Sequence, residues 1–305
     1  MGLLSRCFVA LWMVCAVGAG TAQQPLRVAF TFDDLPAHGP LPPGVQRPEV
    51  IASILATLHQ EEMPPVYGFV NGFRMETFPY QIHILEAWQR AGEPVGNHTW
   101  SHPELDKLTA RQYIANIERN EPVLRALEPR GGWRWFRYPF LEEGDTVAKR
   151  EAVREWLFAH HYRVAEISLD FQDYNWNDTY ARCAAKRDDA AIGRLHDSYL
   201  HAASEATISF RALAHLLYGK DVPYILLLHV GAFDARMLPE LIAQFRSEGF
   251  GFTTLEEASA DPVYAFDPKQ PTAGGSTFLE QVAAARNVRV PELPDYSTEL
   301  NRICR

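Results

Sequence analysis

Short apolar runs alternate with helix-type stretches along almost the whole chain, and this alternation limits the fold more than any other feature of the sequence. Residues 26–32 predict a strand, and residues 49–60, whose apolar side chains recur at helical spacing, predict the helix that follows. The order then recurs, with strands predicted at 66–70, 94–97, 135–137, 163–169, 222–229 and 250–254, and helices at 80–91, from Thr109 onward, 146–160 and 235–249. Repeated units of this kind predict a parallel sheet, either open and doubly wound or closed into a barrel.

Two parts of the chain depart from this repeat. Residues 178–220 are largely helical in pattern and predict an insertion before the most apolar strand. Residues 261–305 contain several prolines and glycines and predict an irregular extension wrapped on the surface. Pro122 is expected to bend or split the helix that starts near Thr109. We therefore expect one α/β domain over residues 23–260 that carries the insertion, followed by the extension.

The N-terminus has the pattern of a secretory signal peptide, residues 1–22. Arg6 provides the positive end, residues 7–17 the apolar run, and Gly20-Thr21-Ala22 a small-residue cleavage site. A transmembrane helix needs about 20 apolar residues, which is more than this run contains. We expect cleavage near Ala22, a secreted or periplasmic protein, and no stable membrane span.

Cysteine content and charge restrict the environment and the partners. Removal of the signal peptide leaves Cys183 and Cys304, a pair compatible with one disulfide in an oxidising compartment or with two free thiols. The full chain has a formal net charge of −9 at pH 7 and no basic run. An acidic chain of this kind is a poor candidate for binding nucleic acid.

Polar residues stand where the predicted strands end, which is where parallel α/β folds place their sites. The motif VAFTFDDLPAHG contains the adjacent Asp33 and Asp34, whose like charges are costly at a buried strand end unless something uses them. The motif GNHTWSHP places His98 and His102 four residues apart, on one face if a helical turn begins there. Two histidines and one aspartate suit a catalytic zinc site, which leaves the second aspartate free as a base. A glycosidase is less natural, because its two carboxylates flank a bond from opposite sides, about 5 Å or more apart.

Three further strand ends carry reactive side chains. WFRYPF contains Arg137, whose guanidinium can pair with a buried carboxylate and keep it ionised. SLDFQDYNW supplies Asp170 and Asp173, and ILLLHVG places His229 at the end of the most apolar strand. A carboxylate such as Asp173 could orient His229 and raise its pKa. A histidine in such a strand is more often a core residue, but five polar strand ends in one chain favour a catalytic site.

The five segments, in this order, resemble the polysaccharide deacetylases of carbohydrate esterase family 4, which share the NodB homology domain. TFDD, HTWSH, RYPF, DFQDY and LLH are similar to the five motifs of that family, and the resemblance covers residues 26–255. It implies an irregular (β/α)7-8 barrel and the metal-dependent hydrolysis of N- or O-acetyl groups on a carbohydrate of the chitin, peptidoglycan or xylan type. The implied cofactor is a divalent cation, Zn²⁺ or alternatively Co²⁺ or Mn²⁺.

The same resemblance implies a role for each matching residue. Asp33 would be the general base, held by Arg137, and His229 would be the general acid, tuned by Asp173. The implied metal ligands are Asp34, His98 and His102. For the substrate, the implied residues are Phe140, whose backbone amide would stabilise the oxyanion, and Leu227 and Trp176, which would line the acetyl pocket.

The sequence departs from the family pattern near the site. Tyr174 stands where the fourth motif usually has tryptophan, and Val230 follows His229 where an aspartate is common. The insertion at 178–220 lies between the fourth and fifth motifs, where it could cap the groove and exclude long polymers. Two alternatives stay open: an amidohydrolase that acts on a small linear or cyclic amide through the same residues, and a non-catalytic carbohydrate-binding homologue, which would lack a ligand or the base.

Overall fold

The computed structural model describes residues 25–128 and 130–305, so the predicted signal peptide lies outside the described residues. Within them, one sheet has parallel strands in the order β5–β4–β3–β2–β1–β6, and β7 pairs with the start of β1. The strands are β1 (Arg27–Leu35), β2 (Tyr67–Val70), β3 (Val95–Asn97), β4 (Trp135–Phe136), β5 (Arg163–Val164), β6 (Tyr224–His229) and β7 (Gly251–Phe252). The predicted parallel sheet is confirmed.

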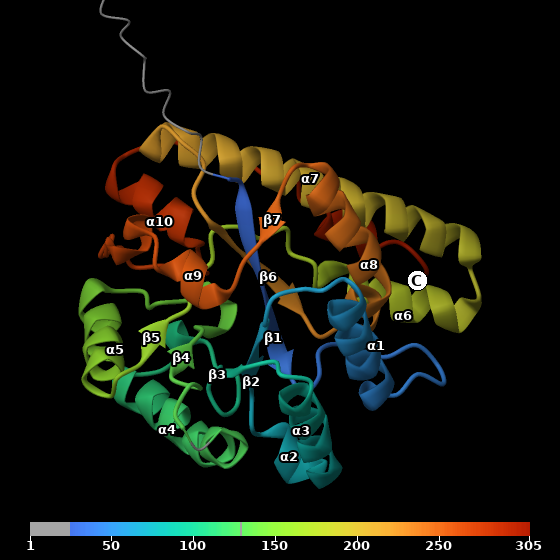
Figure 1. Cartoon of the computed structure of the whole chain (residues 1–305), viewed down its shortest axis with the longest axis horizontal. Coiled ribbons are helices and arrows are strands. Elements are labelled where there is room, and N and C mark those ends of the chain that lie inside the picture. Colours follow the sequence, from blue (N-terminus) through green and yellow to red (C-terminus); the bar gives the residue numbers. More distant parts are fainter. Residues whose placement is uncertain (1–24, 129) are drawn as a thin grey trace, which may run out of the picture.

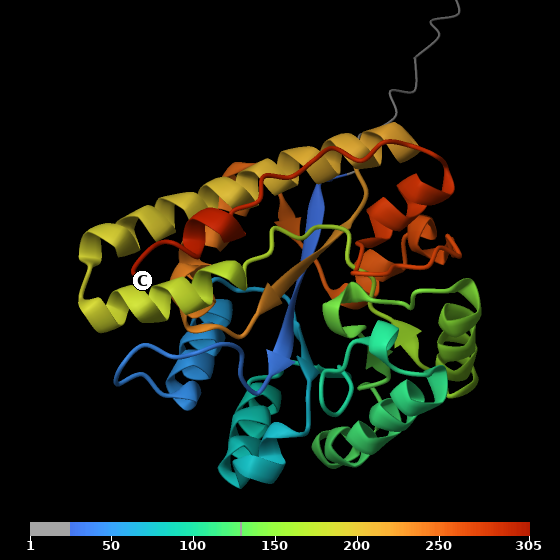
Figure 2. The ribbon, with the colours of Figure 1, turned by 180° about the vertical axis from the view of Figure 1, so that it is seen from behind.

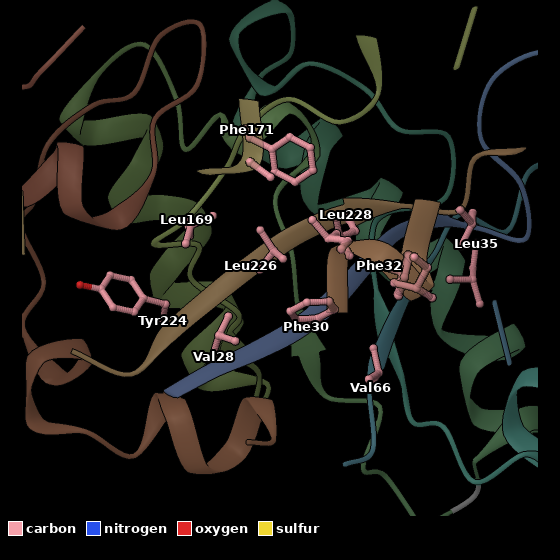
Figure 3. Packing of buried hydrophobic residues seen from close by; sticks show 14 of the residues in the cluster. Val28, Phe30, Phe32, Leu35, Val66, Leu169, Phe171, Tyr224, Leu226 and Leu228 are labelled. Carbon is pink, nitrogen blue, oxygen red and sulfur yellow. The ribbon is translucent and has the colours of Figure 1, made fainter. Parts of the chain in front are cut away.

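β1 lies inside the sheet and is covered on both faces. Its residues Val28, Phe30 and Phe32 belong to the main hydrophobic core, together with alternate residues of β6 (Figure 3). Ala29 belongs to a smaller cluster on the other face, which also contains Phe69 and other inward-pointing residues. A parallel strand that is buried on both sides has to be apolar almost throughout. This requirement explains why residues 28–30, just before TFDD, are all apolar and do not alternate with polar residues.

The sheet curls into an irregular barrel because the chain leaves β5 early and crosses to β6. We expected one strand over residues 163–169, and this prediction is wrong: β5 is Arg163–Val164 only. The chain then moves across, and Leu169 forms a parallel bridge with Leu226 of β6. The same stretch therefore contacts both ends of the strand order, and the predicted class of irregular (β/α) barrel is confirmed.

Helices surround the outside of this sheet (Figures 1 and 2). They are α1 (Arg47–Gln60), α2 (Arg74–Thr77), α3 (Ile82–Arg90), α4 (Ala110–Leu127), α5 (Val147–Ala159), α8 (Ala232–Ser247) and α9 (Leu255–Ser259). Short 3-10 turns occupy Pro79–Gln81, Leu105–Lys107, Pro139–Leu141 and Pro262–Ala265. Most of the predicted helices are present, with ends within a few residues of the predicted ones.

α4 begins at the predicted cap but is not split by proline. The hydroxyl of Thr109 accepts a hydrogen bond from the backbone N–H of Gln112, and the side-chain oxygen of Gln112 accepts one from the backbone N–H of Thr109. The two bonds form a capping box. Pro122 lies inside the single helix, contrary to a split at that residue. Pro122 has no N–H to donate to the carbonyl of Glu118, which would be its usual acceptor. Both residues are exposed, so water can donate to that carbonyl instead.

The predicted insertion consists of two helices, α6 (Asn175–Lys186) and α7 (Asp189–Tyr218). α7 runs the length of the molecule above the sheet in Figure 1. Its buried face presents residues such as Leu195, Tyr199 and Phe210. None of the helices in the described part of the chain, α7 included, combines the length and the apolar character needed to cross a membrane.

The C-terminal extension is more ordered and more buried than expected. It contains α10 (Phe278–Ala285) and α11 (Ser297–Leu300), and Phe278 and Leu279 are buried in the main core. The extension is thus packed on the domain, with α10 in the core and irregular stretches on either side of it. A disulfide joins Cys183 of α6 to Cys304, across 121 residues of sequence. Figure 2 shows the end of the chain running beside α7 to α6.

Candidate active site

Both aspartates of TFDD reach one cavity because β1 is irregular at its end. The pairing of β1 with β2 shifts register between Phe32 and Leu35, and Asp34 has a left-handed φ of 67°. On a regular strand, neighbouring side chains point to opposite faces. Here Asp33 and Asp34 both line a cavity of about 550 Å³ at the carboxyl ends of the strands.

The two histidines come together through a tight loop, not through a helical turn. β3 ends at Asn97, and the loop that follows has left-handed residues at Thr99 (φ 67°) and His102 (φ 53°). The N–H of His102 donates to the Thr99 hydroxyl at 3.1 Å, which closes the loop. The ring centroids of His98 and His102 then lie 4.8 Å apart. The prediction of a helical turn is wrong, but the side chains of His98 and His102 lie close together as predicted.

Asp34, His98 and His102 form a group that could hold a metal ion. One ligand atom from each lies within 4.8 Å of the others. Oδ1 of Asp34 is 3.6 Å from Nε2 of His98 and 3.4 Å from Nε2 of His102. One carboxylate and two imidazoles around one position, with further coordination positions open, are a donor set that suits a catalytic zinc.

The protonation of these rings also fits a cation. Nδ1 of His98 lies 2.8 Å from the carbonyl oxygen of Arg137. A carbonyl can only accept, so Nδ1 of His98 is the donor and the ring is oriented with Nε2 toward the metal position. Burial lowers the pKa of His102 to about 4, although the Asp34 carboxylate opposes the shift. His102 is therefore neutral at physiological pH, as a ligand must be.

His38 also contacts Asp34 and was not identified from the sequence. Its Nδ1–H donates to Oδ2 of Asp34 at 2.7 Å. Burial alone would raise the pKa of Asp34, but the hydrogen bond from His38 and the neighbouring imidazoles hold it well below its usual value. The position of His38 four residues after Asp34 was visible in DDLPAHG. Its contact depends on how the chain turns after β1, which no local pattern reports.

A second possible group overlaps the first, since Asp34, His38 and His229 also bring ligand atoms within 4.8 Å of one another. Burial alone would lower the pKa of His229, but the Asp173 carboxylate raises it to about 10. A protonated imidazole cannot ligate a metal. The group with Asp34, His98 and His102 is therefore the better metal site, and His229 is free to act as an acid.

Arg137 holds Asp33 from below the cavity. The guanidinium is 1% exposed, and its Nη1 donates to Oδ1 of Asp33 at 3.0 Å. Two further bonds, to the Thr31 hydroxyl at 3.1 Å and the Ala165 carbonyl at 2.7 Å, fix the guanidinium in place. A charge-assisted bond from a guanidinium fixed in this way sets the orientation of the carboxylate. The expected contact between Arg137 and Asp33 is present.

The structure selects one of the two candidate partners of His229. Asp173 accepts from Nδ1 of His229 at 2.8 Å and from its backbone N–H at 2.6 Å. Asp170 instead accepts from the backbone N–H of Gln172 and lines the cavity, where burial raises its pKa to about 7. The β1–β6 register places His229 directly opposite Asp33, so acid and base candidates face the same space.

The residues expected to touch the substrate divide into two groups. Phe140 and Leu227 line the cavity as expected. Trp176 does not: it is fully buried, its indole N–H donates to the Ser198 hydroxyl, and it packs against Tyr199 of α7. This corrects the assignment of Trp176 to the acetyl pocket. Tyr174 lines the cavity instead, with its ring 5.3 Å from that of His229.

Comparisons with known proteins agree with this fold and these motifs. A family model described as polysaccharide deacetylase matches residues 21–156. The peptidoglycan-N-acetylglucosamine deacetylase of Bacillus cereus is 28% identical over 150 residues, 48% of this chain and 46% of that protein. The peptidoglycan-N-acetylmuramic acid deacetylase PdaC of Bacillus subtilis is 26% identical over 184 residues, 59% of this chain and 34% of that protein. The matches thus span less than half the length of either relative.

Solved structures show the same fold. A CE4-family pseudoenzyme from Bacillus anthracis aligns with a TM-score of 0.53 at 15% identity, over 77% of this chain and 66% of that one. A curled parallel sheet with a histidine–carboxylate site at its carboxyl edge defines the class as the NodB-type barrel. The chain resembles the polysaccharide deacetylase family, carbohydrate esterase family 4, over residues 21–156, which contain the first three of its five motifs, and the predicted resemblance is confirmed.

Proposed function

We propose that this protein is a metal-dependent deacetylase that hydrolyses N- or O-acetyl groups of a carbohydrate. One observation carries the proposal. A carboxylate held by a buried arginine, a group of one carboxylate and two imidazoles that could hold a metal, and a protonated histidine line the same cavity. Base, metal position and acid are thus all within reach of a single bound acetyl group.

The cation would be held by Asp34, His98 and His102, whose donor set fits Zn²⁺ and also accommodates Co²⁺ or Mn²⁺. When bound, such an ion polarises a carbonyl and lowers the pKa of a water molecule toward about 7. His38 orients the Asp34 carboxylate through its second oxygen, as outer partners of metal ligands usually do.

The side chains supply the proton transfers. Asp33 accepts a proton from water as the water oxygen bonds to the acetyl carbon. The backbone N–H of Phe140 donates to the oxygen that becomes negative in the tetrahedral state. His229 gives its proton to the leaving nitrogen or oxygen as the bond to the acetyl carbon breaks, so that the products are acetate and a free amine or alcohol. Arg137 holds Asp33 in position, and Asp173 holds His229 and favours its protonated form.

The substrate class follows from the relatives and from the cavity. The two bacterial relatives are named for the deacetylation of peptidoglycan, and we extend an acetylated amino-sugar substrate to this chain. A small amide is the second candidate, because α7 and the C-terminal extension both contribute to the cavity wall, at Phe210 and at Gly274–Thr277. The cavity of about 550 Å³ is in the usual size range of small-molecule sites.

A non-catalytic role is less well supported. A pseudoenzyme with this fold exists among the structural neighbours. Loss of catalysis in such a fold is expected to follow loss of a ligand or of the base. Here the base, the three candidate ligands and the acid candidate are all present around one cavity.

Secretion or export to the periplasm, after cleavage near Ala22, is part of the proposal. It is supported by the signal-like N-terminus and by the disulfide between Cys183 and Cys304, a bond typical of oxidising compartments.

The test is acetate release from chitin oligomers, peptidoglycan, acetylxylan and small amides, each measured with and without a chelator. We expect release from at least one acetylated amino sugar, loss of activity with chelator, and recovery with Zn²⁺. Chelator-insensitive release would contradict the mechanism. Release from amides alone would select the amidohydrolase alternative.

A further inference from the structure

The loop that carries Phe140 is unusual in its backbone. Phe140 and Leu141 both have left-handed φ values, 57° and 55°. Non-glycine residues enter this region at a cost of about 1 kcal/mol or more, and two in succession persist only where the surroundings hold them. The Phe140 peptide is also the expected oxyanion donor, so whatever holds this turn controls the geometry of the reaction.

The C-terminal extension supplies that hold. The Thr272 hydroxyl donates to the carbonyl of Leu141 at 3.2 Å and accepts from the N–H of Glu143 at 2.6 Å. The N–H of Thr272 donates to the Gly144 carbonyl at 2.9 Å, and that of Ser276 to the Leu141 carbonyl at 3.3 Å. Residues 272–276 therefore hold the loop at Leu141 and over the residues that follow the turn.

Gly275 touches the turn itself. It has a φ of +84°, and a Cβ built on it would lie 2.1 Å from the carbonyl oxygen of Phe140. No side chain fits in that space, so only glycine allows the extension to lie directly on the Phe140 carbonyl. This carbonyl belongs to the Phe140–Leu141 peptide, next to the peptide that carries the Phe140 N–H, so displacing it would disturb the turn that orients that N–H.

The extension is itself firmly attached. Thr272 is 3% exposed, and α10, which follows residues 272–276, is buried in the core through Phe278 and Leu279. The N–H of Phe278 donates to the carbonyl of Ile167 at 2.6 Å. Residues Gly274 to Thr277 also line the catalytic cavity. The segment is thus both a support of the oxyanion loop and a wall of the site.

We propose that residues 272–276 are a positioning segment of the active site, which sets the Phe140 peptide for oxyanion stabilisation. This inference rests on the proposed deacetylase function. It assigns a part in the reaction to a region that lies outside the five motifs and beyond the matched residues 21–156.

The decisive variant is Gly275→Ala. We expect kcat on an N-acetylated chitin oligomer to fall by about 10²–10³, the usual cost of one lost oxyanion donor. KM and bound zinc should stay close to wild type, because the candidate ligands lie on other loops. The control is Gly44→Ala, which has the same left-handed penalty at φ +83° but no atom within 4 Å of the added Cβ.

A second pair covers the case in which Gly275→Ala does not fold. Thr272→Val removes the hydroxyl while keeping the side-chain shape, and Thr272→Ser restores the hydroxyl. We expect kcat to fall in Thr272→Val and to recover in Thr272→Ser, with zinc content unchanged in both. Wild-type kcat in a folded Gly275→Ala, or in Thr272→Val, would overturn the inference alone. Absence of acetate release by the wild-type protein from every acetylated probe would overturn the proposed function, and the inference with it.

Discussion

At the scale of single residues, the adjacent aspartates have different surroundings and therefore different expected duties. Asp33 is 3% exposed; its Oδ1 accepts from the Arg137 guanidinium, and its Oδ2 lies 3.6 Å from Nε2 of His98, beside the metal group. Asp34 faces three imidazoles and shares its two oxygens between His38 and the metal position. The like charges of the pair are thus offset by different cations and donors, and this separation is what allows base and ligand to be neighbours.

Substitution of each type of residue should separate metal binding from catalysis. Asp33→Asn is expected to bind Zn²⁺ nearly normally and to lose about 10²–10⁴ in kcat, the usual contribution of a general base. His98→Ala is expected to lose both metal and activity. Metal content by atomic emission and acetate release by coupled assay distinguish the two. Equal metal loss in both variants would reverse the assignments of Asp33 and Asp34.

The pair of His229 and Asp173 predicts the alkaline limb of the pH profile. With a pKa near 10, His229 is protonated at neutral pH and loses its proton as the pH rises toward that value. Activity should therefore fall on the alkaline side. In Asp173→Asn the carboxylate that raises the pKa is gone, burial lowers the pKa, and the limb should move to lower pH. Profiles of kcat/KM against pH that coincide for the two proteins would exclude His229 as the acid.

At the scale of elements, the helices outside the barrel repeat connect the end of the chain to the site. α6 carries Cys183 and is tied to the tail by the disulfide, while α7 contributes Phe210 to the cavity and Tyr199 to the packing around Trp176. The tail beyond α10 therefore packs on the insertion and does not hang free. A bond that closes a long loop stabilises chiefly by restricting the unfolded chain.

Removal of this bond should lower stability without removing the catalytic groups. Cys304→Ser is expected to lower the free energy of unfolding by about 2–5 kcal/mol, the usual range for a native disulfide. Urea unfolding followed by fluorescence measures the loss. Wild-type protein with a reducing agent is the control and should match the variant in the same buffer. Equal stability of the oxidised and reduced wild type would show that the bond contributes nothing to the fold.

At the scale of the whole molecule, the carboxyl ends of the barrel strands carry the site, and α7 and the C-terminal extension form part of the cavity wall. The cavity is lined from the ends of several strands, from α7 and from the C-terminal extension, including Leu293. In an open groove, each additional sugar of a polymer makes further contacts with the protein. In a walled cavity, additional sugars make no such contacts. The arrangement predicts how the rate depends on substrate length.

We expect kcat/KM to change little between a diacetylated chitin disaccharide and the acetylated hexamer, and insoluble polymer to be a poor substrate. The reason is that Phe210 of the insertion and Gly274–Thr277 of the extension line the cavity, where we expect them to limit the binding of additional sugars. Initial rates of acetate release across the oligomer series measure this dependence. A steady rise in kcat/KM up to the hexamer would indicate an extended groove and contradict the walled cavity.

The class of fold and most of the chemical groups of the site could be predicted from the sequence. Strand and helix periods depend on nearby residues, and the polar side chains at strand ends stand out against apolar runs. For this reason the residue pattern alone was enough to assign TFDD, HTWSH and Arg137 to one site, and their predicted proximity is present. The same local logic correctly located α1, α5 and the cap of α4 at Thr109.

Features that depend on contacts between distant segments became visible in the three-dimensional structure alone. These are the choice of Asp173 over Asp170, the burial of Trp176, the part played by His38, the crossing of the chain from β5 to β6, and the disulfide. The contact of Gly275 with Phe140 is the clearest case, since 135 positions of sequence separate two backbones that lie against each other. Local residue patterns report propensity and amphipathicity, but which surfaces meet is set by packing of the whole chain. The role of Gly275 could therefore be recognised only from the fold, which places this glycine against the expected oxyanion loop.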